Sequence, residues 1–110
     1  MHSPLRTGIE LFNAGRYYDA HESLEDAWRE CAGPEKLYLQ GLTQAAVALH
    51  HFSTGNLVGA RSVLARAIGN LHAPQGALPI DTPALLAQLE TCSAALRNGT
   101  IPPPPQIQQR

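Results

Sequence analysis

The sequence predicts an all-α protein, a compact bundle of about five helices. Three observations support this fold class: apolar residues recur at helical spacing in five stretches, glycine or proline separates these stretches, and one pattern repeats after forty residues. With 110 residues, 44% of them hydrophobic, the chain is long enough to bury a core. Residues 1–99 are expected to form a single helical domain, and residues 100–110 a proline-rich extended tail.

The first two helices are expected over residues 4–13 and 17–31. Ser3 precedes Pro4, and a serine cap followed by proline at the first helical position is a strong signal for a helix start. Gly15 separates the two helices, because glycine adopts the left-handed backbone that closes a helix at little cost.

The third and fourth helices are expected over residues 34–53 and 57–71. The third is apolar around most of its circumference, which predicts the most enclosed element of the bundle. It also carries glutamine, threonine and histidine, so it is interpreted as a buried helix and not as a membrane span. The fifth helix is expected over residues 83–97, where Thr82 before Pro83 repeats the signal that starts the first helix.

Four consecutive prolines follow Ile101. This composition favours an extended polyproline conformation. Such a run can bind an aromatic groove of another protein, but a solvated tail is the preferred interpretation.

Charge and cysteine usage exclude several classes of function. Eight basic and nine acidic residues give a formal net charge of -1, whereas binding to nucleic acid or to an anionic membrane requires a basic surface. Cys31 and Cys92 form no CxxC pair and are expected to be buried free thiols in a reducing compartment. The start of the chain, Met-His-Ser-Pro-Leu-Arg, shows no signal-peptide pattern. A cytoplasmic protein is therefore expected.

An internal repeat links the two halves of the chain. A glycine turn is followed in both by small residues and a larger apolar residue, a pattern typical of two antiparallel helices that approach closely. The repeat therefore predicts two tetratricopeptide-like helical hairpins. A shift of forty residues aligns Phe12 with Phe52, Gly15 with Gly55, Ala20 with Ala60, Leu24 with Leu64, and Ala27 with Ala67.

Positions that differ between the repeats are candidates for function. His21 and Glu25 lie one turn apart at the edge of an apolar face, where Arg61 and Ala65 stand in the second repeat. The third helix carries a polar stripe that should face them. We therefore expect a polar cluster between the second and third helices, a candidate binding site formed by His21, Glu22, Glu25, Trp28, Gln40, Gln44 and His51.

Two interpretations of this cluster stay open. In the first, it is structural: Glu25, Gln40 and Gln44 connect the helices through hydrogen bonds, and a neighbour satisfies His21. In the second, it binds a ligand or a metal ion.

A divalent metal is the only cofactor that the sequence suggests, and it is the less favoured interpretation. His21 and Glu25 can supply two ligands, and His50 or His51 a third. Residues 21–25 read His-Glu-Ser-Leu-Glu, which departs from the zinc-binding HExxH motif because Glu25 replaces the second histidine.

Several of these residues also carry a resemblance to a known family. They are Phe12-Asn13-x-Gly15-x-Tyr17-Tyr18-x-Ala20-His21-Glu22-x-x-Glu25-x-x-Trp28-Arg29, then Gln40-Gly41-Leu42-x-Gln44-x-Ala46, then His50 or His51 with Gly55-Asn56-x-x-Gly59-Ala60. Together they resemble the bacterial and archaeal family described as domain of unknown function 309. The resemblance implies a compact all-helical fold and a cytoplasmic protein, and it implies no activity.

The expected function is that of a protein-interaction or ligand-binding module, because the helical repeat is accompanied by no complete catalytic motif. A metal-dependent hydrolase that uses His21, Glu25 and a histidine of the third helix is the alternative, so enzymatic activity stays an open question. Extra apolar residues in the last two helices predict a homodimer or another protein partner, the alternative being that the last helix folds back and covers them itself. These residues are Val58, Val63, Leu85, Leu86, Leu89, Ala95 and Leu96.

Overall fold

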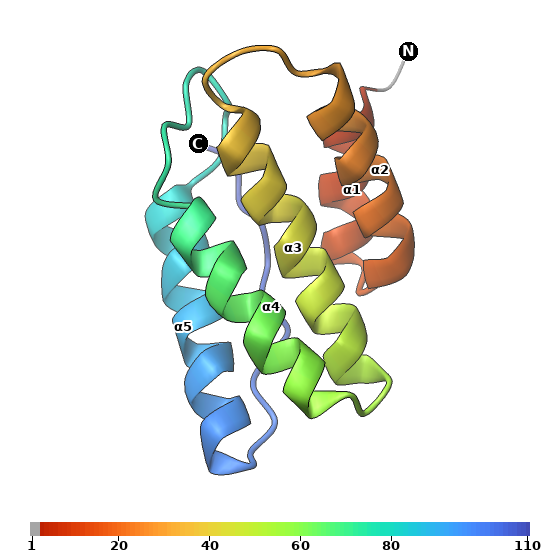
Figure 1. The fold of residues 1–110 in the computed structure, drawn as a ribbon, viewed down its shortest axis with the longest axis vertical. Helices are drawn as coiled ribbons and strands as arrows, with labels where there is room; N and C mark the ends of the chain where they lie inside the picture. Colours follow the sequence, from red (N-terminus) through yellow and green to blue (C-terminus); the bar gives the residue numbers. More distant parts are fainter. Residues whose placement is uncertain (1–2) are drawn as a thin grey trace.

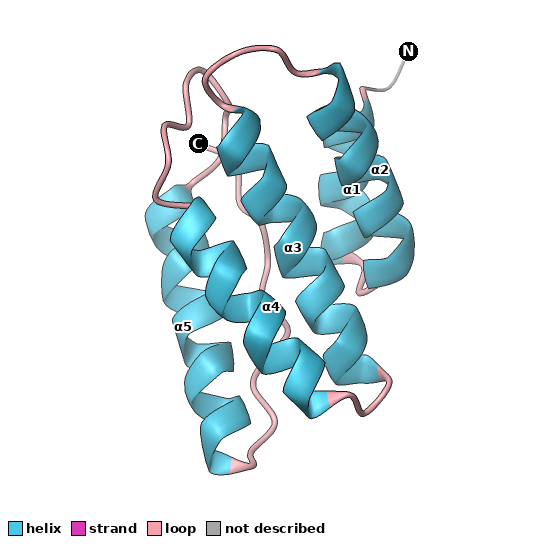
Figure 2. Ribbon diagram, viewed as in Figure 1, coloured by secondary structure: helices cyan, strands magenta, loops and turns pink. Residues whose placement is uncertain are grey.

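Five α-helices followed by an extended carboxyl-terminal segment form the computed structural model, which describes residues 3–110 (Figures 1 and 2). Each helix packs against the next one along the chain, and the described residues contain no strand beyond one isolated β-bridge. The all-α prediction is confirmed. The first two residues, on which the prediction of no signal peptide partly rests, lie outside the described residues. The helices are α1 (Pro4–Asn13), α2 (Tyr17–Glu30), α3 (Lys36–Ser53), α4 (Leu57–Asn70) and α5 (Thr82–Asn98).

Local signals in the sequence set most of the helix boundaries, which differ from the expected ones by at most two residues. Ser3 caps α1, since its Oγ accepts a hydrogen bond from the backbone N–H of Arg6 at 3.1 Å. The cap of α5 differs from the expectation: Asp81, not Thr82, accepts the bond from the N–H of Ala84, at 3.1 Å. Thr82 is instead the first residue of that helix.

The forty-residue repeat corresponds to two hairpins, α1–α2 and α3–α4, that turn in the same way. Gly15 and Gly55 have φ values of 79° and 82°, in the left-handed region that favours glycine. In both hairpins the N–H of the residue after this glycine donates to the carbonyl five residues earlier, at 2.9 Å. Helix packing thus explains the repeat, while the likeness to tetratricopeptide units stays a prediction. The small and apolar positions that the two hairpins share are all buried: Ala20, Leu24, Ala27, Ala60, Leu64 and Ala67.

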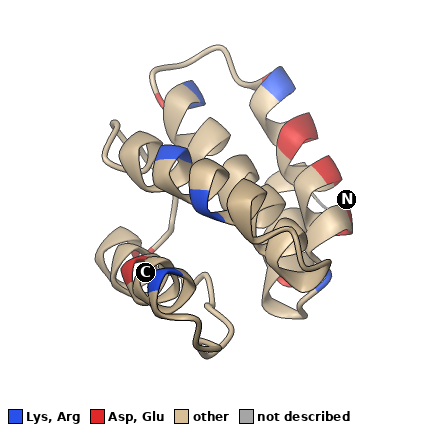
Figure 3. Ribbon diagram, turned by 60° about the horizontal axis from the view of Figure 1, so that its bottom comes forward, with Lys and Arg blue, Asp and Glu red and all other residues tan. Residues whose placement is uncertain are grey.

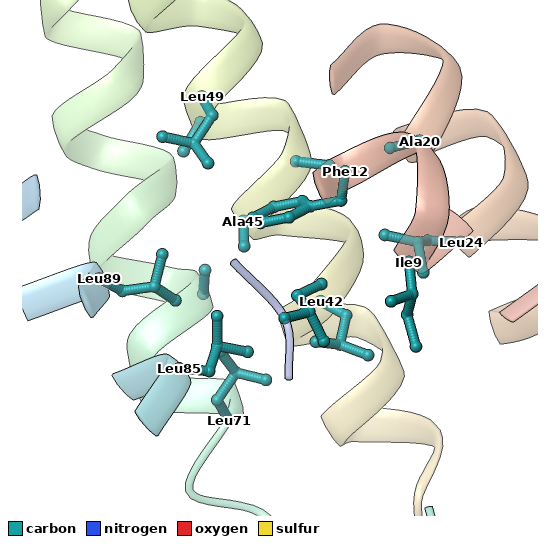
Figure 4. Packing of buried hydrophobic residues seen from close by; sticks show 14 of the residues in the cluster. Ile9, Phe12, Ala20, Leu24, Leu42, Ala45, Leu49, Leu71, Leu85 and Leu89 are labelled. Carbon is teal, nitrogen blue, oxygen red and sulfur yellow. The ribbon is translucent and has the colours of Figure 1, made fainter. Parts of the chain in front are cut away.

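The core is built around α3. Side chains of α1 and α2 approach Leu42 and Ala45 from one side, and side chains of α4 and α5 approach them from the other (Figure 4). Eight residues of α3 are buried, more than in any other helix. The prediction that this helix is the most enclosed element is therefore confirmed.

The carboxyl-terminal segment is extended, but the prediction of a solvated tail is wrong. It runs back along the bundle between α5 and α1 (Figure 1), and Ile107, with 2% of its surface exposed, belongs to the core. The side chain of Asn13 holds this residue through both backbone groups. Its Nδ2 donates to the Ile107 carbonyl at 3.0 Å, and its Oδ1 accepts from the Ile107 N–H at 2.7 Å.

A second amide side chain holds the same segment from the opposite helix. Gln88 of α5 donates to the carbonyl of Gln106 at 3.0 Å and accepts from its N–H at 2.8 Å. Burial of this segment is feasible because proline has no N–H group that needs a partner, and the two amide side chains satisfy the residues that do.

Three further sequence expectations concern exposure. No helix of the described chain combines the length and the apolar character that a bilayer crossing requires. Both cysteines are free thiols, but only Cys92 is buried; Cys31 is half-buried, so the expectation of burial is wrong for this residue. Helix α5 covers part of the apolar surface on which the expected dimer depends, because Leu85 and Leu89 are fully buried, but Val58 remains 81% exposed.

Candidate functional site

The predicted polar cluster lines a hollow on the surface between α2 and α3. The hollow has a volume of about 270 Å³. Five of the seven predicted residues border it, since α2 and α3 run side by side and present these positions to their common boundary. Glu22 and His51 do not. The lining residues are His21, Glu25 and Trp28 of α2, and Gln40, Thr43, Gln44 and Val47 of α3.

A second hollow of about 170 Å³ continues the first one toward the carboxyl-terminal end of α3. It shares His21 and Val47 with the first hollow and adds Tyr18 and His50. The Tyr18 ring lies 5.8 Å from the His21 ring and 5.3 Å from the His50 ring, measured between centroids. We call the two hollows together the α2–α3 groove.

Of the two adjacent histidines, His50 borders this groove. His51 faces the turn after α3, where its Nδ1 lies 3.2 Å from Nδ2 of Asn56. The structure therefore does not bring His51 into the cluster. Glu22 is exposed and does not border the groove.

Glu25 finds its partners within its own helix. Its Oε2 lies 3.3 Å from Nε2 of His21, and its Oε1 accepts a hydrogen bond from Nη2 of Arg29. The expected bonds from Glu25 to the glutamines of α3 do not occur among the described residues. Gln44 instead connects α3 to α4, because its Oε1 accepts from Nδ2 of Asn70 at 2.7 Å.

Several polar groups in the groove are free to bind a ligand. Among residues 3–110, the side-chain amide of Gln40 and the Nε2 group of Gln44 form no hydrogen bond. Within the same part of the chain, no buried side-chain nitrogen or oxygen lacks a partner, so these free groups are open to solvent. The groove thus combines an apolar floor at Val47 with amide donors and acceptors of half-buried glutamines.

Lys36, which sequence reasoning did not single out, holds one end of the groove. Its Nζ lies 4.2 Å from the centroid of the Trp28 ring and donates to the carbonyls of Trp28, at 2.9 Å, and Cys31, at 3.1 Å. A cation is favourable there, because it meets both the aromatic face and the backbone carbonyls at the carboxyl-terminal end of α2. The feature of the sequence that could have indicated this residue is its position, because Lys36 is the single lysine of the chain and the first residue of α3.

The described residues do not assemble the metal site that the sequence suggested. His21 and Glu25 adjoin, but no group of three histidine, cysteine, aspartate or glutamate side chains lies close enough to hold a metal ion in residues 3–110. A catalytic metal site requires about three protein ligands. Neither His50 nor His51 completes the pair.

These features define a small all-α protein with an open, partly polar groove between two antiparallel helices. Residues 5–63 match the family described as Domain of unknown function (DUF309), and the chain belongs to this family. The matched stretch includes all of α1 except Pro4, all of α2 and α3 with the whole α2–α3 groove, and the first half of α4. It does not include α5 or the carboxyl-terminal segment.

Two relatives have recognisable sequence similarity. The uncharacterized protein YpuF of Bacillus subtilis (strain 168) is 38% identical over 97 residues, which cover 78% of this chain and 56% of the relative. An uncharacterized protein of Aquifex aeolicus (strain VF5) is 32% identical over 100 residues, which cover 89% of this chain and 30% of the relative. The chain thus spans about half, and less than a third, of the lengths of these relatives. No solved structure matches it.

Proposed function

We propose that this chain is a cytoplasmic binding module that holds a short peptide segment of a partner protein in the α2–α3 groove. The observation that supports the proposal is the continuous groove with an apolar floor and free amide groups. A glutamine side chain carries both a donor and an acceptor, so the free amide of Gln40 matches the backbone C=O and N–H of an extended peptide. The free Nε2 of Gln44 can donate to a further peptide carbonyl, while its Oε1 stays bonded to Asn70. Trp28 and Tyr18 offer apolar contact at the two ends.

The length of the groove sets the size of the peptide. Tyr18 and Trp28 are ten residues apart on α2, which corresponds to about 15 Å at 1.5 Å per residue. An extended chain advances about 3.3 Å per residue. The groove therefore fits about four or five peptide residues.

The charge of α2 favours a peptide with a basic residue. This helix carries five acidic residues and one arginine, and its acidic residues gather on one side of the bundle (Figure 3). Glu25 is paired with Arg29, but Glu22, which is exposed on the same helix, has no ion-pair partner among the described residues. A positively charged peptide is steered toward such a surface.

The single tryptophan of the chain gives a direct test. We expect that titration with a library of five-residue peptides changes Trp28 fluorescence in a saturable way, most strongly for basic members. Val47→Glu, which puts a charge on the groove floor, should abolish the response, and Gln40→Ala should weaken binding several-fold, in line with the loss of about 1 kcal/mol per hydrogen bond. Gln108→Ala, an exposed glutamine outside the groove, is the matched control.

Two results contradict the proposal. One is unchanged Trp28 fluorescence with every peptide of the library. The other is equal peptide affinity in the Val47→Glu variant and the unmodified chain, because the ligand then binds elsewhere.

The metal-dependent hydrolase is not favoured, because the described residues offer no third ligand beside His21 and Glu25. Metal analysis of protein purified without an affinity tag should give substoichiometric metal. One equivalent of zinc, iron or manganese that is lost in a His21→Ala variant would restore this alternative.

A further inference from the structure

A second groove lies between α4 and α5, and its chemistry differs from that of the first. Its volume is about 410 Å³, larger than either hollow of the α2–α3 groove. We call it the α4–α5 groove. Its lining residues are Val58, Arg61, Ser62 and Ala65 of α4, and Ser93 and Arg97 of α5.

The internal repeat relates the two grooves. Shifted by forty residues, Arg61 takes the place of His21, and Ala65 takes the place of Glu25. Each groove therefore lies beside the second helix of a hairpin, along the same helix positions. In the second groove the histidine and carboxylate are replaced by an arginine and a methyl group, so the same place in the scaffold is basic.

The arginines of the α4–α5 groove lack the acidic partners that the arginines of the first hairpin have. Among the described residues, no carboxylate lies within 4.0 Å of the guanidinium of Arg61, Arg66 or Arg97. In Figure 3 the basic segments of α4 have no acidic segment beside them. Glu90 of α5 is two turns before Arg97 and does not border the groove. In the first hairpin every arginine is paired: Arg6 with Glu10, Arg16 with Asp19, and Arg29 with Glu25 and Asp26.

Two serine hydroxyls complete the polar lining. Ser93 accepts a hydrogen bond from Nη1 of Arg97 at 3.1 Å, which leaves its own O–H free to donate into the groove. Ser62 lies on α4 beside Arg61. Guanidinium and hydroxyl groups are the donors that bind phosphate oxygens, and the guanidinium fork suits them in particular.

We propose that the α4–α5 groove binds a small phosphate ester. Arg61 and Arg97 approach the phosphate from the two helices, and the hydroxyls of Ser62 and Ser93 donate to its oxygens. Val58, which is 81% exposed, and Ala65 lie against the organic part of the ligand. The proposal does not depend on the peptide-binding function, since the two grooves share no residue.

Arginine side-chain NMR at constant ionic strength tests this site. Titration with glycerol 3-phosphate should shift the Nε–H signals of Arg61 and Arg97 in a saturable way. Inorganic phosphate should do so with at least several-fold lower affinity, because it lacks the organic part. Arg61→Gln and Arg97→Gln should each lower the affinity at least ten-fold, the loss expected for a charge-assisted hydrogen bond of about 1.5 to 3 kcal/mol. Arg6→Gln, which removes a paired arginine of α1, should leave it unchanged.

Three outcomes overturn the proposal. The first is a response to sodium chloride equal to that with the ester. The second is equal affinity for inorganic phosphate and the ester, which excludes a contact with the organic part. The third is full binding by the Arg61→Gln, Arg97→Gln double variant, with circular dichroism showing that it is folded.

Discussion

Removal of the Ile107 side chain should destabilise the whole bundle. This residue has 2% of its surface exposed and packs in one cluster with Phe12, Leu85 and Leu89, which belong to α1 and α5. Truncation of a buried isoleucine to alanine typically costs about 2 to 5 kcal/mol, through lost transfer free energy and the cavity that remains. Since a domain of this kind has a total stability of about 5 to 15 kcal/mol, the loss is a large part of it.

Urea unfolding measures this loss, with Trp28 fluorescence and far-ultraviolet circular dichroism as probes. Ile107→Ala should lower the unfolding midpoint without a change of slope, since the slope reflects the surface exposed on unfolding. Ile101→Ala is the matched control: the same truncation, six residues away, removes a side chain that is 86% exposed, so the free energy of unfolding should change by less than about 0.5 kcal/mol.

The comparison of the two variants decides the matter. Equal midpoints for Ile107→Ala and Ile101→Ala would show that the segment is solvated, as the sequence predicts, and does not pack in the core. Asn13→Ala is an independent probe of the same contact. It leaves both backbone groups of Ile107 without their partner and should cost about 1 to 3 kcal/mol.

Three further predictions concern packing, pH and assembly. Gly8→Ala should destabilise the protein, because a Cβ there would lie 2.6 Å from the Leu24 side chain, whereas Gly69→Ala, with open space at that position, should stabilise α4 by about 0.5 to 1 kcal/mol in urea unfolding. Burial raises the pKa of Tyr38 and Cys92 above their ordinary values of 10.0 and 9.0, so both bind protons more tightly when folded. The stability that these two raised pKa values contribute is fully present below about pH 9 and is lost as the pH rises through the folded pKa values. The free energy of unfolding should therefore fall as the pH is raised over that range. Light scattering at micromolar concentration should give a mass near twice 11.8 kDa, about 24 kDa, and a mass near 12 kDa that persists on concentration would exclude the dimer.

The helices could be predicted from the sequence because their signals are local. A serine before a proline and a glycine after an apolar stretch act within one turn, so Ser3 and Gly15 are enough to place the ends of α1. The packed carboxyl-terminal segment could not be predicted in this way. Its position depends on Asn13, which is 94 residues from Ile107 in the chain. No local sequence pattern around either residue indicates a contact with the other.

The candidate groove was predictable for a related reason. Helical periodicity places His21, Glu25 and Gln40 on defined faces, and the short connection between α2 and α3 makes these helices neighbours. Periodicity does not determine which hydrogen-bond partner a side chain finds at the end of a helix, where His51 contacts Asn56. It also gives no indication that Gln44 bonds to α4, because that contact depends on how two hairpins pack.

The repeat separates residues that build the scaffold from residues that supply chemistry, and Glu25 and Leu24 test this separation on one helix. Leu24 is fully buried at a position that both hairpins share, so Leu24→Ala should cost about 2 to 5 kcal/mol in urea unfolding. Glu25 is unique to the first hairpin and pairs with His21 and Arg29, which both stay accessible to solvent. Without a buried partner to leave unpaired, Glu25→Ala should cost less than about 1 kcal/mol, the usual range for an exposed ion pair. A cost above 2 kcal/mol would show that the polar cluster holds the helices together, and the α2–α3 groove would then be a structural contact.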